Sequence, residues 1–264
     1  MGEHKPLALV TGASSGIGLE LAKQFAERGY DLVVNAEDVG IDAAAAELRR
    51  TGADTVSVRA DLRTQEGVEQ VHGAVLATGR PLDAAALNAG VGCGGGFLDQ
   101  DFTHVEEIVE LNVISTLRLG QIVLRDMVAR GEGRVLITSS IASTMPGSFQ
   151  AVYNASKSFL QSFAEAVQDE LRDTGVTITS LMPGPTATNF FHRAGMDDTL
   201  VGTSSQDDPA QVAKQGVDAL LNGDAKVLGG SLSSKAQAVI SGVLPDKLKA
   251  AAHRRMAEPG SGGE

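Results

Sequence analysis

Short runs of β-branched and apolar residues alternate with amphipathic helical stretches along most of this 264-residue chain. The predicted strands are LALV (7–10), DLVVN (31–35), TVSVR (55–59), LDAAALN (82–88), RVLITS (134–139), VTITSL (176–181) and KVL (226–228). The predicted helices between them span residues 16–28, 41–50, 65–78, 101–130, 150–173 and 209–222. Strands that alternate with helices form right-handed βαβ units. The pattern therefore predicts an α/β fold, in which helices cover both faces of a parallel sheet.

Two segments lie outside this alternation. Residues 185–208 are rich in loop-forming residues, and residues 229–264 contain one further helical pattern, PDKLKAAAHRRMA. That pattern is followed by the Gly- and Pro-rich tail EPGSGGE, which we expect to be disordered and flexible. Because no long linker and no internal repeat divides the chain, residues 1–264 are predicted to form a single domain.

Charge, hydropathy and the numbers of cysteine and histidine residues argue against several kinds of partner and site. The net charge of −11 disfavours nucleic acid, since phosphate binding needs clustered Lys and Arg. No apolar run reaches the ~18 residues of a membrane span, so we expect no membrane partner. Cys93 is the single cysteine, which excludes an intramolecular disulfide and fits a cytoplasmic location. The five histidines show neither HxxxH nor HExxH spacing, so no protein-bound metal is predicted.

A glycine-rich segment follows the first predicted strand. In VTGASSGIGLEL, three glycines, Gly12, Gly16 and Gly18, stand between a strand and the start of a helix. Glycines at such a position let the backbone approach a pyrophosphate, and the helix supplies free N–H groups. The spacing is G-x3-G-x-G rather than G-x-G-x-x-G, and a simple tight turn also explains three glycines. The position between strand and helix favours a dinucleotide site.

Tyr153 and Lys157 lie four residues apart in a predicted helix, so they share one face. An ammonium ~4 Å from a phenolate contributes roughly 4 kcal/mol at an effective dielectric constant near 20. This interaction would lower the phenol pKa by up to about three units, which makes the phenol a usable general acid/base. Ser140, just past the fifth predicted strand, could hold a substrate carbonyl. A surface tyrosine beside an exposed lysine is the alternative interpretation of the pair.

Taken together, the motifs resemble the short-chain dehydrogenase/reductase family over about residues 5–228. The matching segments are TGASSGIG (11–18), DL (61–62), NAG (88–90), Asn112 in LNV, Ser140 in TSSIAS, YNASK (153–157) and PGPTAT (183–188). The resemblance implies a single doubly wound Rossmann-type domain with a seven-stranded parallel sheet. Relatives of this kind are often homodimers or homotetramers, which here would assemble through residues 101–130 and 150–173.

The same resemblance implies four catalytic residues. Tyr153 would exchange a proton with a carbonyl or an alcohol, and Ser140 would hydrogen-bond the same oxygen. Lys157 would hold the nicotinamide ribose and lower the phenol pKa. Asn112 would support a water chain to Lys157.

The resemblance also implies the contacts of a nicotinamide dinucleotide. The glycine loop would hold the pyrophosphate and the adenosine ribose, residues 61–62 the adenine, residues 88–90 the central part and residues 183–188 the carboxamide. The implied residues are Thr11, Gly12, Ser14, Ser15, Gly16, Ile17, Gly18, Glu37, Asp61, Leu62, Asn88, Ala89, Gly90, Tyr153, Lys157, Pro183, Gly184, Thr186 and Thr188.

The end of the second predicted strand bears on the choice between NAD(H) and NADP(H). The segment VVNAEDVG carries no basic residue, and Glu37 and Asp38 would repel a 2′-phosphate. Ala36 stands where an NAD-type Asp is expected. The sequence therefore favours NAD(H) over NADP(H), with Glu37 as the ribose partner, unless Arg59 or Arg63 points inward.

The resulting prediction is an NAD(P)-dependent oxidoreductase that interconverts a small carbonyl compound and an alcohol. Residues 185–208 would form a lid over the substrate, with Phe190, Phe191 and Met196 either lining an apolar pocket or packing the lid. A catalytically idle nucleotide-binding redox sensor of the same fold is the alternative. A sugar-nucleotide epimerase or dehydratase shares the Tyr/Lys pair, but such relatives usually have a longer C-terminal substrate domain.

Overall fold

A computed structural model describes residues 5–231, 234–235 and 245–263 of the chain. These residues form a seven-stranded, all-parallel sheet of order β3-β2-β1-β4-β5-β6-β7. The strands are β1 (Leu7–Thr11), β2 (Asp31–Ala36), β3 (Thr55–Arg59), β4 (Ala84–Leu87), β5 (Gly133–Thr138), β6 (Val176–Pro183) and β7 (Lys226–Gly229). Every residue of the central strands β1, β2 and β4 is buried, because helices cover both faces of the sheet. The predicted fold is confirmed.

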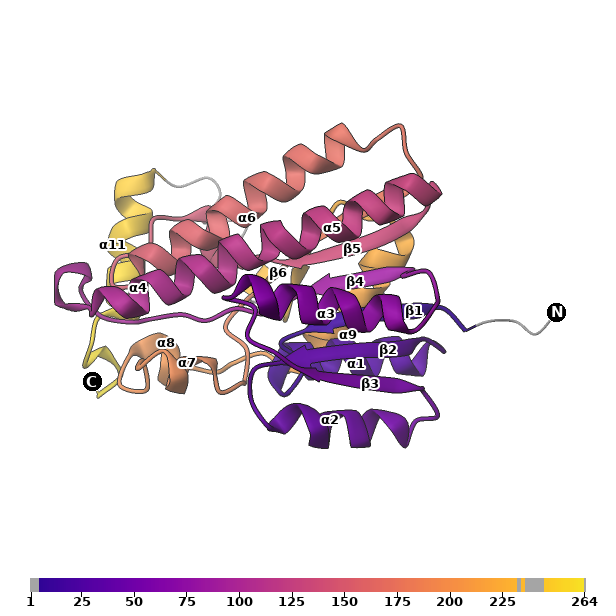
Figure 1. Cartoon of the computed structure of the whole chain (residues 1–264). Helices are drawn as coiled ribbons and strands as arrows, with labels where there is room; N and C mark the ends of the chain where they lie inside the picture. Colours follow the sequence, from indigo (N-terminus) through magenta and orange to yellow (C-terminus); the bar gives the residue numbers. More distant parts are fainter. Residues whose placement is uncertain (1–4, 232–233, 236–244, 264) are drawn as a thin grey trace.

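Helices cover the two faces of the sheet (Figure 1). The first face packs against α1 (Gly16–Glu27), α2 (Gly40–Arg49) and α9 (Pro209–Asn222), and the second against α3 (Gln65–Ala77), α5 (Ser115–Arg130) and α6 (Ala151–Glu170). Each layer buries one apolar stripe, with Phe25 of α1 fully buried on the first face and Leu119 of α5 on the second. None of the described helices is both long and apolar enough to cross a bilayer.

The predicted helix 101–130 is interrupted in the structure. Helix α4 (Phe102–Ile108) passes into a π-helical turn, η2 (Val109–Ile114), before α5 begins. The wider turn changes which side chains face the sheet, and such turns occur frequently at functional sites. Asn112 lies within it and is fully buried.

The chain reverses direction across the sheet between β1 and β4. From β1 the chain continues outward through β2 and β3, and it then returns to place β4 on the other side of β1. Ligands of open α/β sheets bind at such a switch point, beyond the carboxyl ends of the strands. Both the glycine loop after β1 and residues 88–90 after β4 lie at this edge.

Residues 185–208, the predicted lid, and the C-terminal segment pack together at one end of the molecule. Within residues 185–208 two short helices form, α7 (Phe190–Arg193) and α8 (Leu200–Thr203), and α11 (Asp246–Ala257) contacts α8 (Figure 1). A small apolar cluster joins them, in which Met196 is fully buried.

The C-terminal tail differs from the disorder expected for it. The 3-10 turn η4 (Ser261–Gly263) contacts α8, and Gly262 N donates a hydrogen bond to Asp198 O at 2.8 Å. Ser261 Oγ also accepts from Leu200 N at 2.9 Å. These bonds depend on a loop some sixty positions earlier, which composition alone does not show.

Candidate active site

One pocket at the carboxyl end of the sheet collects almost all of the predicted site residues. The predicted residues that line it are Gly12, Ser14, Ser15, Gly16, Ile17, Gly18, Glu37, Asp61, Leu62, Asn88, Ala89, Gly90, Ser140, Tyr153, Lys157, Pro183, Gly184, Thr186 and Thr188. Two predicted residues, Thr11 and Asn112, lie beneath the wall of the pocket rather than in it.

The glycine loop has a geometry that fits the phosphates of a dinucleotide. Gly12 and Gly16 adopt φ angles of +66° and +55°, a region that side chains other than glycine rarely enter. A Cβ on Gly18 would lie 2.0 Å from Gly12 O, so the first turn of α1 packs directly on the loop. Ser15, the N-cap of α1, makes no side-chain cap. The first N–H groups of the helix therefore face the pocket without a side-chain acceptor, as an anion site requires.

Thr11 ties together the strand ends beneath this loop. Its Oγ1 accepts hydrogen bonds from Asn88 N at 2.9 Å and from Ala89 N at 3.1 Å. The Asn88 side chain donates to Thr11 O at 3.1 Å and accepts from Thr138 Oγ1 at 3.0 Å. The resemblance placed Thr11 in contact with the cofactor. In the structure the Thr11 hydroxyl is bonded to the backbone of residues 88–89 and the residue is 2% exposed, so its side chain holds this part of the pocket wall in place.

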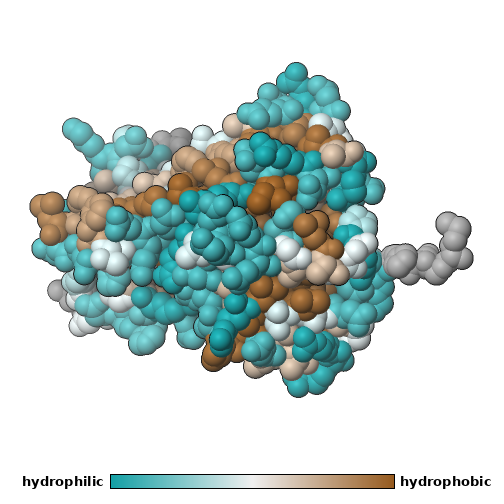
Figure 2. All heavy atoms as spheres, in the orientation of Figure 1, coloured by the Kyte–Doolittle hydropathy of each residue, from teal (hydrophilic) through white to brown (hydrophobic). Residues whose placement is uncertain are grey.

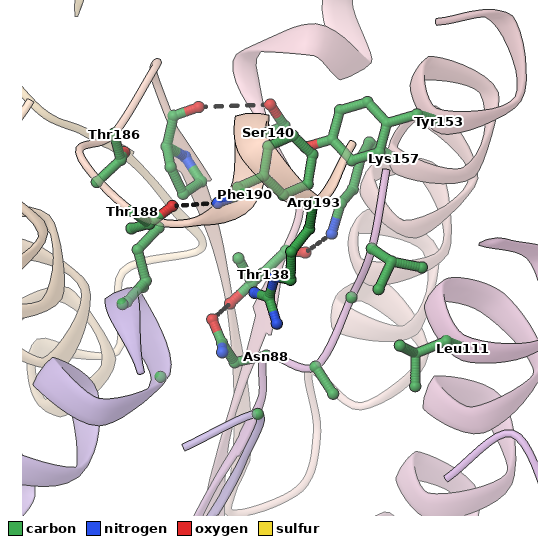
Figure 3. A pocket seen from close by; sticks show the side chains of 18 of the residues that line it. Asn88, Leu111, Thr138, Ser140, Tyr153, Lys157, Thr186, Thr188, Phe190 and Arg193 are labelled. Carbon is green, nitrogen blue, oxygen red and sulfur yellow. Dashed lines mark hydrogen bonds between the residues drawn. The ribbon is translucent and has the colours of Figure 1, made fainter. Parts of the chain in front are cut away.

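Ser140, Tyr153 and Lys157 meet at one end of the pocket. Figure 3 shows the Ser140 hydroxyl and the Tyr153 phenol on the same side, with Lys157 behind them. The Lys157 ammonium nitrogen donates to Thr138 O at 2.9 Å and lies 5.8 Å from the centre of the Tyr153 ring. Ser140 Oγ accepts from Ala142 N at 3.1 Å, which fixes the hydroxyl at the end of β5. The predicted proximity of the three side chains is therefore present.

The predicted lowering of the Tyr153 pKa is wrong. Burial raises the pKa of Tyr153 to about 12, and the neighbouring Ser140 hydroxyl lowers it only in part. Burial also lowers the pKa of Lys157 to about 8. The prediction assumed an ammonium ~4 Å from the phenolate at moderate dielectric. In the structure the amine bonds a backbone carbonyl instead, and burial is the main cause of both pKa shifts.

Asn112 positions the residues around Lys157. Its side chain donates to Val91 O at 2.9 Å and to Ser156 Oγ at 3.0 Å, and it accepts from Val91 N at 2.9 Å. A Cβ on Gly90 would lie 3.0 Å from Asn112 Oδ1 and 3.3 Å from Lys157 Nζ. A side chain at Gly90 would therefore press on both groups, which approach the backbone closely there.

Carboxylates surround the end of the pocket formed by β2 and β3. Glu37 and Asp61 both bind Arg63, at 2.5 and 2.9 Å, and Glu107 binds it at 3.3 Å. Asp38 accepts a hydrogen bond from Ser14 Oγ at 2.7 Å. Arg63 is not among the described residues that line the pocket, and its charge is shared among three carboxylates. The local charge is therefore acidic.

The substrate side of the pocket includes residues that the motifs did not indicate. They are Ile141, Met145, Gln150, Arg193, Val201, His253 and Met256. Phe190 and Phe191 line the pocket, as one of the two predicted alternatives has it, whereas Met196 packs inside the lid. No local pattern marks His253 or Met256, because α11 reaches the pocket only through tertiary packing.

Comparisons with known proteins agree with this architecture. The family model described as short chain dehydrogenase matches residues 6–199. An oxidoreductase of Bacillus subtilis named YmfI is 31% identical over 191 residues, which cover 70% of this chain and 77% of that protein. A very-long-chain 3-oxoacyl-CoA reductase of Podospora anserina is 35% identical over 184 residues, which cover 67% of this chain and 54% of that protein.

A solved structure extends the likeness to three dimensions. It is a short-chain dehydrogenase from Sphingobium yanoikuyae in complex with NADPH, 28% identical with a TM-score of 0.76. The likeness covers 89% of this chain and 92% of that one. On these matches and on the sheet and pocket described above, the chain belongs to the short-chain dehydrogenase family of oxidoreductases.

Proposed function

We propose that this protein interconverts a ketone or aldehyde and an alcohol with a nicotinamide cofactor, and that Tyr153 exchanges the proton. The observation that carries the proposal is that one pocket contains Ser140, Tyr153 and Lys157 together with the glycine loop, which leads into a helix without a side-chain cap. Hydroxyl and phenol groups at one end, and free helix N–H groups at the other, match a carbonyl beside a dinucleotide.

The chain's own residues would donate the proton and orient the substrate carbonyl. The nicotinamide ring supplies the hydride or accepts it when the cofactor is bound. Ser140 Oγ accepts from Ala142 N at 3.1 Å and donates to Pro183 O at 3.4 Å, a long bond that a substrate oxygen would replace. Tyr153, from the first turn of α6, donates to the same oxygen. Its pKa of about 12 keeps the phenol protonated at neutral pH, as a proton donor in carbonyl reduction must be.

We further propose a preference for NAD(H). The support is the acidic end of the pocket, where Glu37 and Asp38 line the wall and Arg63 is bound by carboxylates. A 2′-phosphate placed there would meet uncompensated negative charge. Ribose hydroxyl groups would instead donate to Glu37.

We also propose that the active species is a homo-oligomer built on α5 and α6. Phe159 on α6 is 43% exposed and stacks on Phe163 at 6.2 Å, and Val128 on α5 is 38% exposed. Figure 2 shows apolar atoms among hydrophilic ones over this side of the molecule. Light scattering during gel filtration tests the proposal, since a monomer at micromolar concentration contradicts it.

The experiment that tests the function compares wild-type protein with Tyr153→Phe. Consumption of NADH and NADPH is followed with a panel of ketones and aldehydes, and cofactor binding is measured by fluorescence. We expect turnover to fall by about 10²–10⁴-fold with cofactor affinity retained. Cofactor binding without turnover of any carbonyl or alcohol by the wild type would instead support the idle redox sensor.

A further inference from the structure

Helix α11 closes one side of the active-site pocket. His253 and Met256 line the same pocket as Ser140 and Tyr153, although the family model matches only residues 6–199. His253 is only 5% exposed, so its imidazole is enclosed by protein and by the space of the pocket. The described mechanism does not use this side chain.

Contacts with the segment before α6 fix the position of the imidazole. His253 Nδ1 lies 2.9 Å from Ser148 O, and Ser148 Oγ donates to Ala250 O at 3.3 Å. The Arg254 guanidinium lies 5.0 Å from the centre of the Phe149 ring, in the next residue of the same segment. Phe149 adopts φ +63°, which is unusual for a residue other than glycine and is held by this packing.

The bond to Ser148 determines which ring nitrogen carries the hydrogen. A carbonyl oxygen only accepts hydrogen bonds, so Nδ1 is the protonated nitrogen. Burial lowers the pKa of His253 below its usual value, and the ring is therefore neutral at pH 7. Nε2 then carries a lone pair and acts as an acceptor.

This acceptor has no partner within the described part of the chain. The contact with Ser148 is the one hydrogen bond of the His253 ring among these residues. Nε2 is also not one of the described side-chain atoms that are sealed from solvent without a hydrogen bond. His253 lines the pocket, and its Nε2 is neither bonded to a described residue nor sealed from solvent, so this acceptor is open to a donor group.

The surroundings define the chemistry of a group that could bind there. Ile141, Met145 and Met256 make much of the substrate side apolar. Arg193 lines the same pocket, as Figure 3 shows, so a cationic group would be repelled. A neutral O–H or N–H donor on an otherwise apolar molecule meets both conditions.

We propose that His253 Nε2 binds a hydroxyl or amide N–H group of the substrate, which is otherwise an apolar ketone or aldehyde. The carbonyl part of this statement rests on the proposed function. Recognition by His253 is a binding event and does not require turnover, so the two can be tested separately.

The test measures dissociation constants by calorimetry in the presence of cofactor. The probes are aryl ketones in which the chain between carbonyl and ring is lengthened by one methylene at a time, each with and without a ring hydroxyl. We expect at least one hydroxylated ketone to bind the wild type about tenfold more tightly than its partner, the typical effect of one hydrogen bond. Equal affinities within every pair overturn the proposal.

His253→Asn is the informative variant. The amide nitrogen of Asn can replace Nδ1 as the donor to Ser148 O. The amide oxygen is bonded to Cγ and lies nearer the backbone, so the position of Nε2 is left without an acceptor. We expect the tenfold preference to vanish while the unsubstituted ketones bind as before, and retention of the preference overturns the assignment. His72→Asn, the same change at a histidine that pairs with Asp126 outside the pocket, should retain it.

NADH consumption by the same proteins separates this inference from the proposed function. If the hydroxylated ketones bind preferentially but are not reduced, the assignment of His253 stands and the oxidoreductase proposal fails. If ketones are reduced without preference, the proposed function stands and the assignment of His253 fails.

Discussion

The ring of Phe190, in the lid, lies 5.1 Å from the ring of Tyr153 and is tilted by 51° to it. The Phe190 ring also reaches Gly92, where an added Cβ would lie 2.5 Å from its Cζ. Phe190 therefore helps to bury the Tyr153 phenol, and burial raises the pKa of Tyr153.

Phe190→Ala is expected to move the Tyr153 pKa from about 12 toward 10, because water then reaches the phenolate. The chain has two tyrosines and no tryptophan, so ultraviolet titration in a Tyr30→Phe background reports Tyr153 alone. Phe159→Ala, on the exposed side of α6, serves as the control and should leave the titration unchanged. An unaltered pKa in Phe190→Ala would assign the shift to other parts of the pocket.

Lys157→Met is expected to stabilise the fold at pH 7 by about 1–3 kcal/mol and to abolish activity. Burial lowers the pKa of Lys157 from 10.5 to about 8, so below pH 8 the folded state carries a poorly solvated ammonium. Between about pH 8 and pH 10.5 the unfolded chain binds the additional proton, and wild-type stability rises with pH. Urea unfolding at pH 7 and pH 9 should show this rise in the wild type and not in the variant.

The matched control is Lys214→Met, since the Lys214 side chain is 63% exposed and pairs with Asp218 on the surface. Its stability should differ little from the wild type at either pH. A lower midpoint for Lys157→Met than for wild type at pH 7 would show that the bond to Thr138 O outweighs the desolvation of the amine.

Glu37→Gln is expected to lower the KM for NADP(H) by about tenfold and to raise that for NAD(H). The change removes one negative charge from the pocket and releases Arg63 from one of its carboxylates. Glu107→Gln is the control, because Glu107 also binds Arg63 but is not among the described residues of the main pocket. A tenfold preference of the wild type for NADP(H) would contradict the proposed use of NAD(H).

Gly90→Ala is expected to reduce kcat at least tenfold, since the new methyl group would lie 3.0 Å from Asn112 Oδ1 and 3.3 Å from Lys157 Nζ. Steady-state kinetics and thermal unfolding together check this. Gly73→Ala provides the comparison, because no atom lies within 4 Å of the added group on α3 and the fold should gain about 0.5–1 kcal/mol. Wild-type kcat in Gly90→Ala would show that Lys157 tolerates displacement.

The sequence predicts the sheet closely because each strand is a local apolar run bounded by turns. The segments 55–59 and 209–222 form a strand and a helix with the predicted bounds. The glycine loop and Ser140 can also be placed from the sequence, because each follows a predicted strand. Tyr153 and Lys157 can be placed because a spacing of four residues puts them on one face of a helix.

Other features depend on the assembled fold and left no local pattern. The π-helical turn at Val109–Ile114 replaces part of a predicted continuous helix, and its hydrogen bonds join Asn112 to Val91 and Ser156. The sign of the Tyr153 pKa shift depends on burial, which a spacing of four residues does not reveal. The approach of His253 to Ser148 joins positions 105 residues apart.

Because α11 is attached to the segment before α6, the pocket is built from two separate parts of the chain. Ser140 and Tyr153, the proposed partners of the carbonyl oxygen, respectively follow β5 and lie in α6, whereas His253, the proposed acceptor for a substrate donor, lies in a helix beyond β7. Substitutions in that final helix can therefore redirect the enzyme toward new molecules while the sheet, and the chemistry that it supports, stays untouched. A library confined to residues 246–257 would be a natural starting point for changing what this protein accepts.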